Sequence, residues 1–182
     1  MDKFMDNTGA ADMEHVTKTE FHTAEYTIQF EIDYPVIINN NYNSALLIIT
    51  VIDAFGQIVM KFSMPNYKAF ELYDNLYKME AIYEPGSNDL VTRTVEIPPQ
   101  QNMRYSVITQ MSTSGTQVLF MFLETDMVNK NRHKCISVNI SIDCFEYINL
   151  FELLQVNFAN MPIDVMKFNN AWYYYEHMDE FI

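Results

Sequence analysis

The sequence predicts an α+β fold built from an internally duplicated unit of four antiparallel strands and one helix. Three observations support this prediction: a weak internal repeat, short runs of β-branched and aromatic residues bounded by turn signals, and two segments whose apolar residues recur at helical spacing. With 182 residues, of which 49% are hydrophobic, the chain is long and apolar enough to bury a core.

The repeat keeps its order along the chain. Residues 16–19 (VTKT) recur as 91–94 (VTRT), 25–28 (EYTI) as 104–107 (RYSV), and 58–63, at an offset of 78, as 136–141. Few positions are identical, so chance similarity in an apolar, Thr-rich chain is the alternative to a true duplication.

In the first unit, Tyr26, Ile28 and Phe30 alternate with polar residues, as expected of a half-buried strand. Turn-forming residues at 39–41 (NNN) and 53–56 (DAFG) separate the strands. After the strands the apolar period changes to that of a helix. We expect strands at 16–21, 26–32, 45–52 and 57–63, and a helix over 66–82 with Phe70, Tyr73, Leu76 and Tyr77 on one face.

The second unit repeats this pattern. We expect strands at 91–97, 103–111, 116–124 and 134–141. Asp143, with Glu146 three positions later, predicts a capping box at the start of the second helix, and Pro162 predicts its end. The predicted apolar face of this helix consists of Phe145, Ile148, Phe151, Leu154 and Phe158.

These elements divide the chain into a polar N-terminal segment (1–14), a first repeat with its helix (15–88), a second repeat with its helix (89–162) and an acidic, aromatic C-terminal tail (163–182). Each helix has one apolar face to bury, and the other copy offers a matching one. We therefore expect the two helices to pack together and the outer faces of the sheets to be exposed for binding.

The chain is acidic, since 24 Asp and Glu against 11 Lys and Arg give a formal net charge of −13. This charge argues against a protein that coats duplex DNA by electrostatics alone. The two cysteines, Cys135 and Cys144, are too few for a disulfide framework. No apolar run approaches the roughly 20 residues needed to cross a bilayer, and the N-terminus lacks a secretory pattern, so we expect a cytoplasmic protein.

Signatures of catalysis and of metal binding are missing from the sequence. The four histidines show no paired spacing, and His133 with Cys135 forms one ligand pair without a second. The sequence contains no nucleophile elbow, no Gly-rich phosphate loop and no zinc-protease motif. We expect a non-enzymatic protein without a metal or other cofactor.

Three segments of the second unit precede the predicted helix: 102–107 (NMRYSV), 118–124 (VLFMFLE) and 132–138 (RHKCISV). Together with the helix, they resemble the positive cofactor four family of transcriptional coactivators. In that family, two units of four strands and a helix pair through their helices and bind single-stranded nucleic acid across the sheets. The related Whirly proteins carry both copies in one chain, so the resemblance implies a Whirly-like fold. The match covers residues 102–157 and is weaker in the first unit.

The resemblance also implies binding residues. Arg104 matches a basic strand residue that faces nucleic acid in the family, and Lys134 matches the lysine of a Lys-Gly-Ile-Ser segment, although Cys135 replaces the glycine. Glu25 replaces the basic residue in the first unit, and the loop 112–115 lacks the lysines expected there. The resemblance therefore implies an asymmetric nucleic-acid face.

Single strands bind to a modest number of cations when bases also stack on aromatic rings. Lys18 and Arg93 are related by the repeat, and we expect them to place two cations symmetrically. The alternative is that the cations are ordinary solvent-facing strand residues and that the tyrosines point into the core. The candidate nucleic-acid-binding residues are Lys18, Lys61, Arg93, Arg104, Tyr105, Arg132 and Lys134, with Tyr26 as a second platform.

The C-terminal tail is similar in character to the acidic, aromatic-tipped C-termini of single-strand-binding proteins. It predicts a site for a replication, recombination or nuclease protein; the alternative is that its aromatic residues pack on the domain. The candidate partner-binding residues are Trp172, Tyr174, Asp179, Glu180 and Phe181.

We interpret the chain as a single-stranded DNA-binding protein that acts in replication, recombination or transcription. The abundance of Asn, Tyr, Met, Ile and Phe is typical of an AT-rich genome, which favours a phage or mobile element as its source. The main alternative is an acidic inhibitor, of the anti-CRISPR or DNA-mimic type, that binds a nucleic-acid enzyme of the host. A virion subunit and a homo-oligomer are further possibilities that the sequence leaves open.

Overall fold

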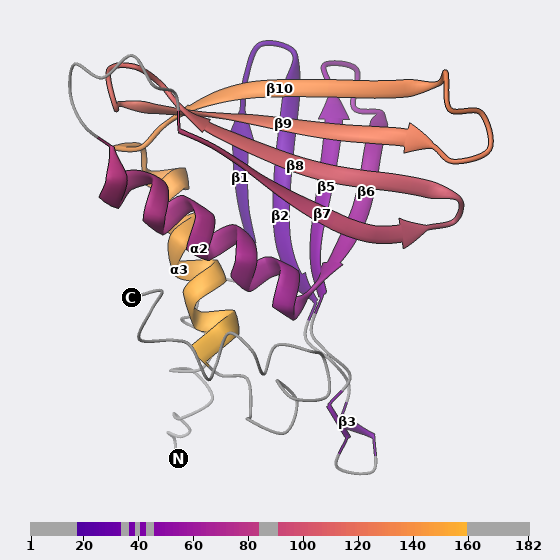
Figure 1. Ribbon diagram of the computed structural model, residues 1–182, viewed down its shortest axis with the longest axis horizontal. Helices are drawn as coiled ribbons and strands as arrows, with labels where there is room; N and C mark the ends of the chain where they lie inside the picture. The colour runs from indigo at the N-terminus through magenta and orange to yellow at the C-terminus, as the bar shows by residue number, and fades with distance from the viewer. Residues whose placement is uncertain (1–17, 34–36, 39–40, 43–45, 84–90, 160–182) are drawn as a thin grey trace.

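The computed structural model describes residues 18–33, 37–38, 41–42, 46–83 and 91–159 (Figure 1). The first unit contains β1 (Lys18–His22), β2 (Tyr26–Asp33), β5 (Leu46–Asp53), β6 (Ile58–Pro65) and α2 (Asn66–Ile82). The second contains β7 (Thr92–Gln100), β8 (Met103–Met111), β9 (Gln117–Asp126), β10 (His133–Ser141) and α3 (Phe145–Ala159). The predicted duplicated unit of four strands and a helix is confirmed.

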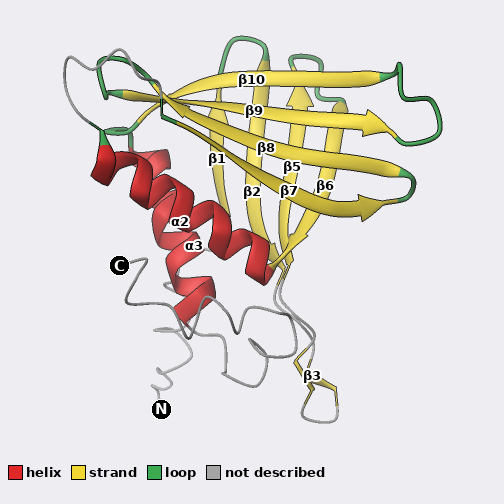
Figure 2. Ribbon diagram, in the orientation of Figure 1, coloured by secondary structure: helices red, strands yellow, loops and turns green. Residues whose placement is uncertain are grey.

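Each unit forms its own antiparallel sheet, whose four strands lie side by side in chain order (Figure 2). The strand order is β1-β2-β5-β6 in the first sheet and β10-β9-β8-β7 in the second. A short ribbon, β3 (Ile37–Ile38) with β4 (Asn41–Tyr42), was not predicted; it flanks the predicted Asn-rich turn.

The two sheets face each other and share one core. Figure 1 shows their strands crossing, with those of the second sheet running over those of the first. Phe30 of β2 contacts two phenylalanines of β9, with its ring centroid 6.2 Å from that of Phe120 and 6.2 Å from that of Phe122. All three side chains are buried. The buried side chains of the alternating pattern, which predicted half-buried strands, therefore form the contact between the two units.

The helices connect the two units, as expected. Tyr73 of α2 and Phe151 of α3 meet edge to face, with ring centroids 5.8 Å apart. α3 also packs on β1, where the Thr19 hydroxyl donates a hydrogen bond to the carbonyl of Glu146 at 3.3 Å. α2 packs on β7 and β8, so each helix contacts the sheet of the other unit. Among the described residues, no helix is long and apolar enough to span a lipid bilayer.

Two details predicted for α3 were wrong. A capping box would place Asp143 directly before the helix, but α3 begins at Phe145, so Cys144 has that place. The predicted apolar face is also rotated: Phe145 is 72% exposed and Ile148 is 55% exposed. The buried side chains of the helix are Tyr147, Leu150, Leu153 and Leu154. The helix is apolar on most of its circumference, so spacing alone did not identify the side that meets β1 and α2.

Tyr147 carries an isolated polar group into this interface. Its hydroxyl is buried and has no hydrogen-bond partner among the residues that the structure describes. Burial is the main reason that its pKa is raised. Removing the hydroxyl with Tyr147→Phe is expected to raise the free energy of unfolding by about 1 kcal/mol, because an unsatisfied buried group is costly. Urea denaturation followed by circular dichroism measures this.

Tyr77→Phe in α2 is the control for Tyr147→Phe, because Tyr77 is exposed and its hydroxyl loses little hydration on folding. We expect no measurable change in stability for the control. A loss of stability in Tyr147→Phe would show that the hydroxyl has a partner in the folded protein.

Candidate nucleic-acid interface

Lys18 lies on the outer face of the first sheet among acidic neighbours. It pairs across the strands with Glu31, and its ammonium lies 3.7 Å from the carboxylate of Glu20. The imidazole of His22 lies 3.6 Å from the same carboxylate. The positive charge at this edge of the sheet is therefore largely balanced locally.

Arg93 does not occupy the position equivalent to Lys18. It pairs with Thr109, whose side chain is only 1% exposed, so Arg93 lies on the inner side of the second sheet. Burial raises the pKa of Asp74 in α2. The positive charge of Arg93 has the opposite and smaller effect on this pKa. The prediction of two symmetric cations was wrong, because the matching sequences are displaced by one residue and a one-residue shift reverses the face of a strand.

Tyr105 is a core residue. It is 7% exposed, and its ring stacks on Phe62 with centroids 4.6 Å apart and planes at 14°. Burial and a hydrogen bond to Glu124 raise the pKa of Tyr105 to about 12. Because Phe62 covers its ring, Tyr105 does not offer an open platform for a base, and the core alternative applies. Tyr26 likewise is partly buried and packs against the core.

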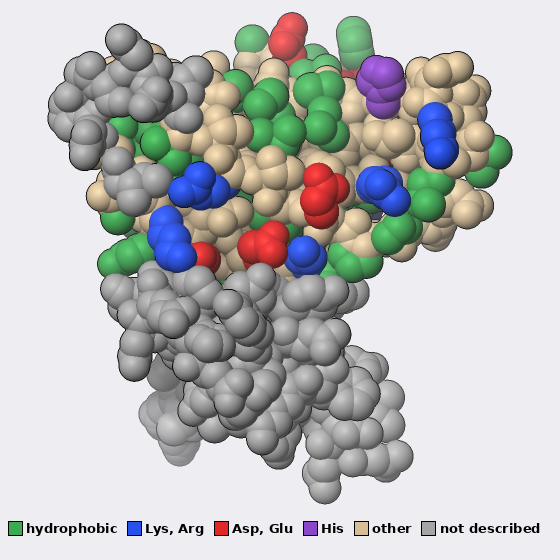
Figure 3. All heavy atoms as spheres, in the orientation of Figure 1, with side chains coloured by type: hydrophobic (Ala, Val, Ile, Leu, Met, Phe, Trp, Pro, Cys, Tyr) green, Lys and Arg blue, Asp and Glu red, His purple; other side chains and the backbone are tan. Residues whose placement is uncertain are grey.

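Positive side chains gather at the end of the second sheet where β9 turns into β10. Arg104 pairs with Thr125, and Thr125 with His133, so these side chains form one row on the outer face. Lys130 and Arg132 are exposed in the adjoining β9–β10 loop. Figure 3 shows Lys, Arg and His side chains toward this end of the face. We call Arg104, Lys130, Arg132, His133 and Lys134 the cationic end.

The two carboxylates at the cationic end are already engaged. The Oδ1 atom of Asp126 accepts hydrogen bonds from the backbone N–H groups of Val128 at 2.9 Å and Asn129 at 3.1 Å, which lower the pKa of Asp126. The Glu124 carboxylate interacts with the Tyr105 hydroxyl and lies 3.9 Å from the Lys134 ammonium. A hollow of about 290 Å³ opens between these acids and the neighbouring cations.

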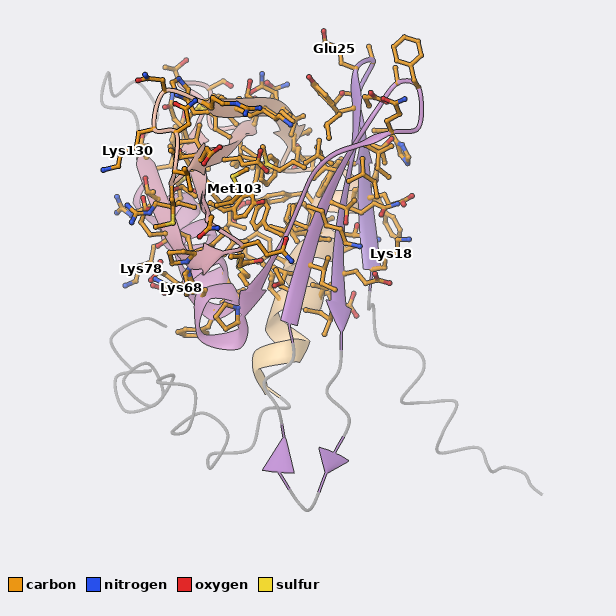
Figure 4. The ribbon with its side chains drawn as sticks, turned by 90° about the vertical axis from the view of Figure 1, so that its right-hand side faces the viewer. Lys18, Glu25, Lys68, Lys78, Met103 and Lys130 are labelled. Carbon is orange, nitrogen blue, oxygen red and sulfur yellow. The ribbon has the colours of Figure 1, made fainter. Side chains whose placement is uncertain are left out.

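Lys134 also joins the two sheets. Its ammonium donates a hydrogen bond to the backbone carbonyl of Val59 at 2.6 Å, across from β10 to the edge strand β6. Lys61, two residues further along β6, is exposed on the outer face of the first sheet. The structure therefore brings Lys134 to the edge strand that carries Lys61, whereas Arg104 lies on the outer face of the second sheet. Figure 4 shows Lys130 and Lys18 on opposite sides.

Lys130 and His133 were not among the residues predicted to bind nucleic acid. Residues 130–134 (KNRHK) are a basic run in an acidic chain, and this signal would have identified both. The predicted partner-binding residues Trp172, Tyr174, Asp179, Glu180 and Phe181 lie outside the described residues, as does segment 1–14. Within the described ranges, no three His, Cys, Asp or Glu side chains gather as metal ligands, and Cys135 and Cys144 are free thiols.

Two crossing four-stranded sheets, each followed by a helix, define a Whirly-like fold, as the sequence resemblance implied. The structure is similar to the crystal structure of WHY3 from Arabidopsis thaliana, with a TM-score of 0.55 and 11% sequence identity, covering 85% of this chain and 92% of that chain. The plant transcriptional regulator PBF-2 matches with a TM-score of 0.46 and 10% identity over 88% of this chain and 96% of that one. At such identities the likeness concerns the fold alone. No family model and no curated protein matches the sequence.

Proposed function

We propose that the chain is a non-enzymatic, single-stranded DNA-binding protein that holds the strand at the cationic end. The observation that carries this proposal is the gathering of Arg132, His133 and Lys134 around a hollow whose two carboxylates already have partners. The Whirly-like fold and the resemblance of residues 102–157 to positive cofactor four support it. Among the predicted cations, Arg104, Arg132 and Lys134 belong to the cationic end, and Lys18, Lys61 and Arg93 do not.

The acidic chain sets the strength of this binding. A net charge of −13 repels a polyanion at long range, but salt screens charges that are more than about 10 Å apart at 0.1 M. Local contacts to phosphates act at shorter range, and bases that stack add about 1–3 kcal/mol each. We therefore expect binding that needs only a few cations and does not depend on sequence.

Charge reversal at the cationic end tests the proposal. Each of the variants Arg104→Glu and Arg132→Glu is expected to weaken binding of oligo-dT about tenfold. Each should also make the slope of log K against log salt concentration about 0.7 shallower, the value for one lost phosphate contact on a single strand. Fluorescence anisotropy over a series of salt concentrations measures both quantities.

Lys18→Glu is the matched control, because it makes the same change in net charge at the opposite side of the molecule (Figure 4). We expect its affinity to stay within about threefold of the wild type. Equal losses in all three variants would show that binding responds to net charge and not to the cationic end.

Absence of binding by the wild-type protein at low salt would instead favour the acidic inhibitor. This alternative needs solvent-accessible carboxylates, and the helices carry several: Glu80 of α2, and Glu146 and Glu152 of α3. For the DNA-binding protein and for the inhibitor alike, we propose a phage or mobile element as the source. For the DNA-binding protein we also propose a role in replication, recombination or transcription.

A further inference from the structure

A second hollow lies beside the cationic end, and its chemistry is different. It measures about 590 Å³ and opens between the outer face of the first sheet and the β7–β8 turn. Ile48 and Lys61 line it from the first sheet, Gln101 lines it from the turn, and the stacked rings of Phe62 and Tyr105 also contribute. Its volume falls within the roughly 300–1,000 Å³ of small-molecule sites.

The described lining of this hollow includes no carboxylate, in contrast to the smaller hollow, which contains Glu124 and Asp126. It combines an apolar wall, provided mainly by the half-buried Ile48 because Phe62 and Tyr105 are buried, with the amide of Gln101 and the ammonium of Lys61. An apolar wall suits a flat heteroaromatic ring, an amide donates to and accepts from the polar edge of a base, and an ammonium binds a phosphate. A nucleotide unit presents all three of these groups.

The β7–β8 turn holds Gln101 at this hollow in a fixed conformation. Gln101 has a φ of 49° and Asn102 a φ of 64°, so both central residues of the turn are left-handed, where glycine or asparagine is the usual choice. The Gln100 side chain anchors the turn to β6, because its Oε1 accepts the backbone N–H of Ser63 at 3.1 Å and its Nε2 donates to the Ser63 carbonyl. The turn therefore holds Gln101 in a left-handed backbone conformation that is unfavourable for glutamine.

The two hollows are neighbours along β6. The Lys134 ammonium, at the smaller hollow, contacts Val59, and Lys61 of the larger hollow follows two residues later on the same strand. The hydroxyl of Tyr105, which lines the larger hollow, interacts with Glu124, which lines the smaller one.

We infer that the larger hollow is a base pocket. It takes one nucleobase of the single strand whose phosphates lie on the cationic end, with Gln101 bonding to the edge of the base and Lys61 to its phosphate. This inference rests on the proposed function and adds to it a defined contact with a base.

The test compares oligo-dT of about 12 nucleotides with an abasic oligomer of the same length, which keeps the phosphates and lacks the bases. Fluorescence anisotropy at one low salt concentration gives the ratio of the two affinities. We expect the wild-type protein to bind oligo-dT about tenfold more tightly than the abasic oligomer.

Two variants probe the pocket. Ile48→Trp fills it with a large side chain, and Gln101→Gly removes the amide while easing the left-handed backbone, so the fold is preserved. Both are expected to bring the ratio close to one without changing the affinity for the abasic oligomer. Asn102→Gly is the matched control, since it eases the same turn at a residue outside the pocket lining, and it should keep the wild-type ratio.

The outcomes separate this inference from the proposed function. No binding to either oligomer would overturn both. Equal affinities of the wild-type protein for the two oligomers, or a ratio that neither pocket variant lowers, would overturn the base pocket and leave the cationic end in place. A ratio that falls equally in Asn102→Gly would also overturn the pocket, because the turn and not Gln101 would then be responsible.

Discussion

Replacing Phe120 by alanine is expected to lower the free energy of unfolding by about 3–5 kcal/mol, the usual cost of removing a buried aromatic ring. Phe120 belongs to the second unit, but its ring lies 6.5 Å from that of Phe21 and 6.2 Å from that of Phe30, both in the first unit. It is fully buried. The cavity left by the substitution would therefore open at the contact between the two sheets.

Urea denaturation followed by circular dichroism measures this loss, and we expect a single transition, because the two sheets share one core. Met121→Ala is the control. It lies on the same strand, but its side chain is half-buried on the outer face, so we expect a loss of about 1 kcal/mol or less. Two separate transitions in Phe120→Ala, with only one displaced from its wild-type position, would show that the sheets unfold independently.

Gly115→Ala is expected to be the second most destabilising change, by about 2–4 kcal/mol. Gly115 lies in the β8–β9 loop with a φ of 71°, and an added Cβ would overlap the ring of Tyr83. Tyr83 follows α2, and its hydroxyl donates a hydrogen bond to the Thr113 carbonyl at 2.7 Å. The substitution would therefore displace the end of α2 from the second sheet.

Gly56→Ala separates the two causes of this loss. Gly56 has a φ of 82°, but an added Cβ would meet no atom within 4 Å. It should lose only the backbone contribution, about 1–2 kcal/mol. Thermal unfolding of both variants measures the difference. Equal losses would mean that the Tyr83 ring moves aside freely and that the contact contributes little to stability.

Much of the fold was predictable because the residues within each strand or helix, and the turns beside it, determine that element. The predicted strand 103–111 and the predicted helix 66–82 have the bounds of β8 and α2. In both cases the apolar period and the flanking turn residues agree. The two-residue ribbon of β3 and β4 carries no such period, so no signal identified it.

The errors arose where the outcome depends on pairing across the fold. Lys18 and Arg93 lie in matching sequence segments, but their faces are set by their strand partners, Glu31 and Thr109. The ring of Tyr105 is covered because β6 brings Phe62 onto it, a contact between residues far apart in the chain. Gln101 gave no signal at all, because a glutamine with positive φ does not differ from any other glutamine in a sequence.

Because each helix packs on the sheet of the other unit, cutting the chain between its two units would separate each sheet from a helix that covers it. A fragment that ends after α2 would lack the helix that packs on β1, and the complementary fragment would lack the helix that packs on β7. Neither fragment alone could shield the apolar side of its own sheet. When the two halves are coexpressed, we expect them to associate, because each carries a helix that packs on the sheet of the other.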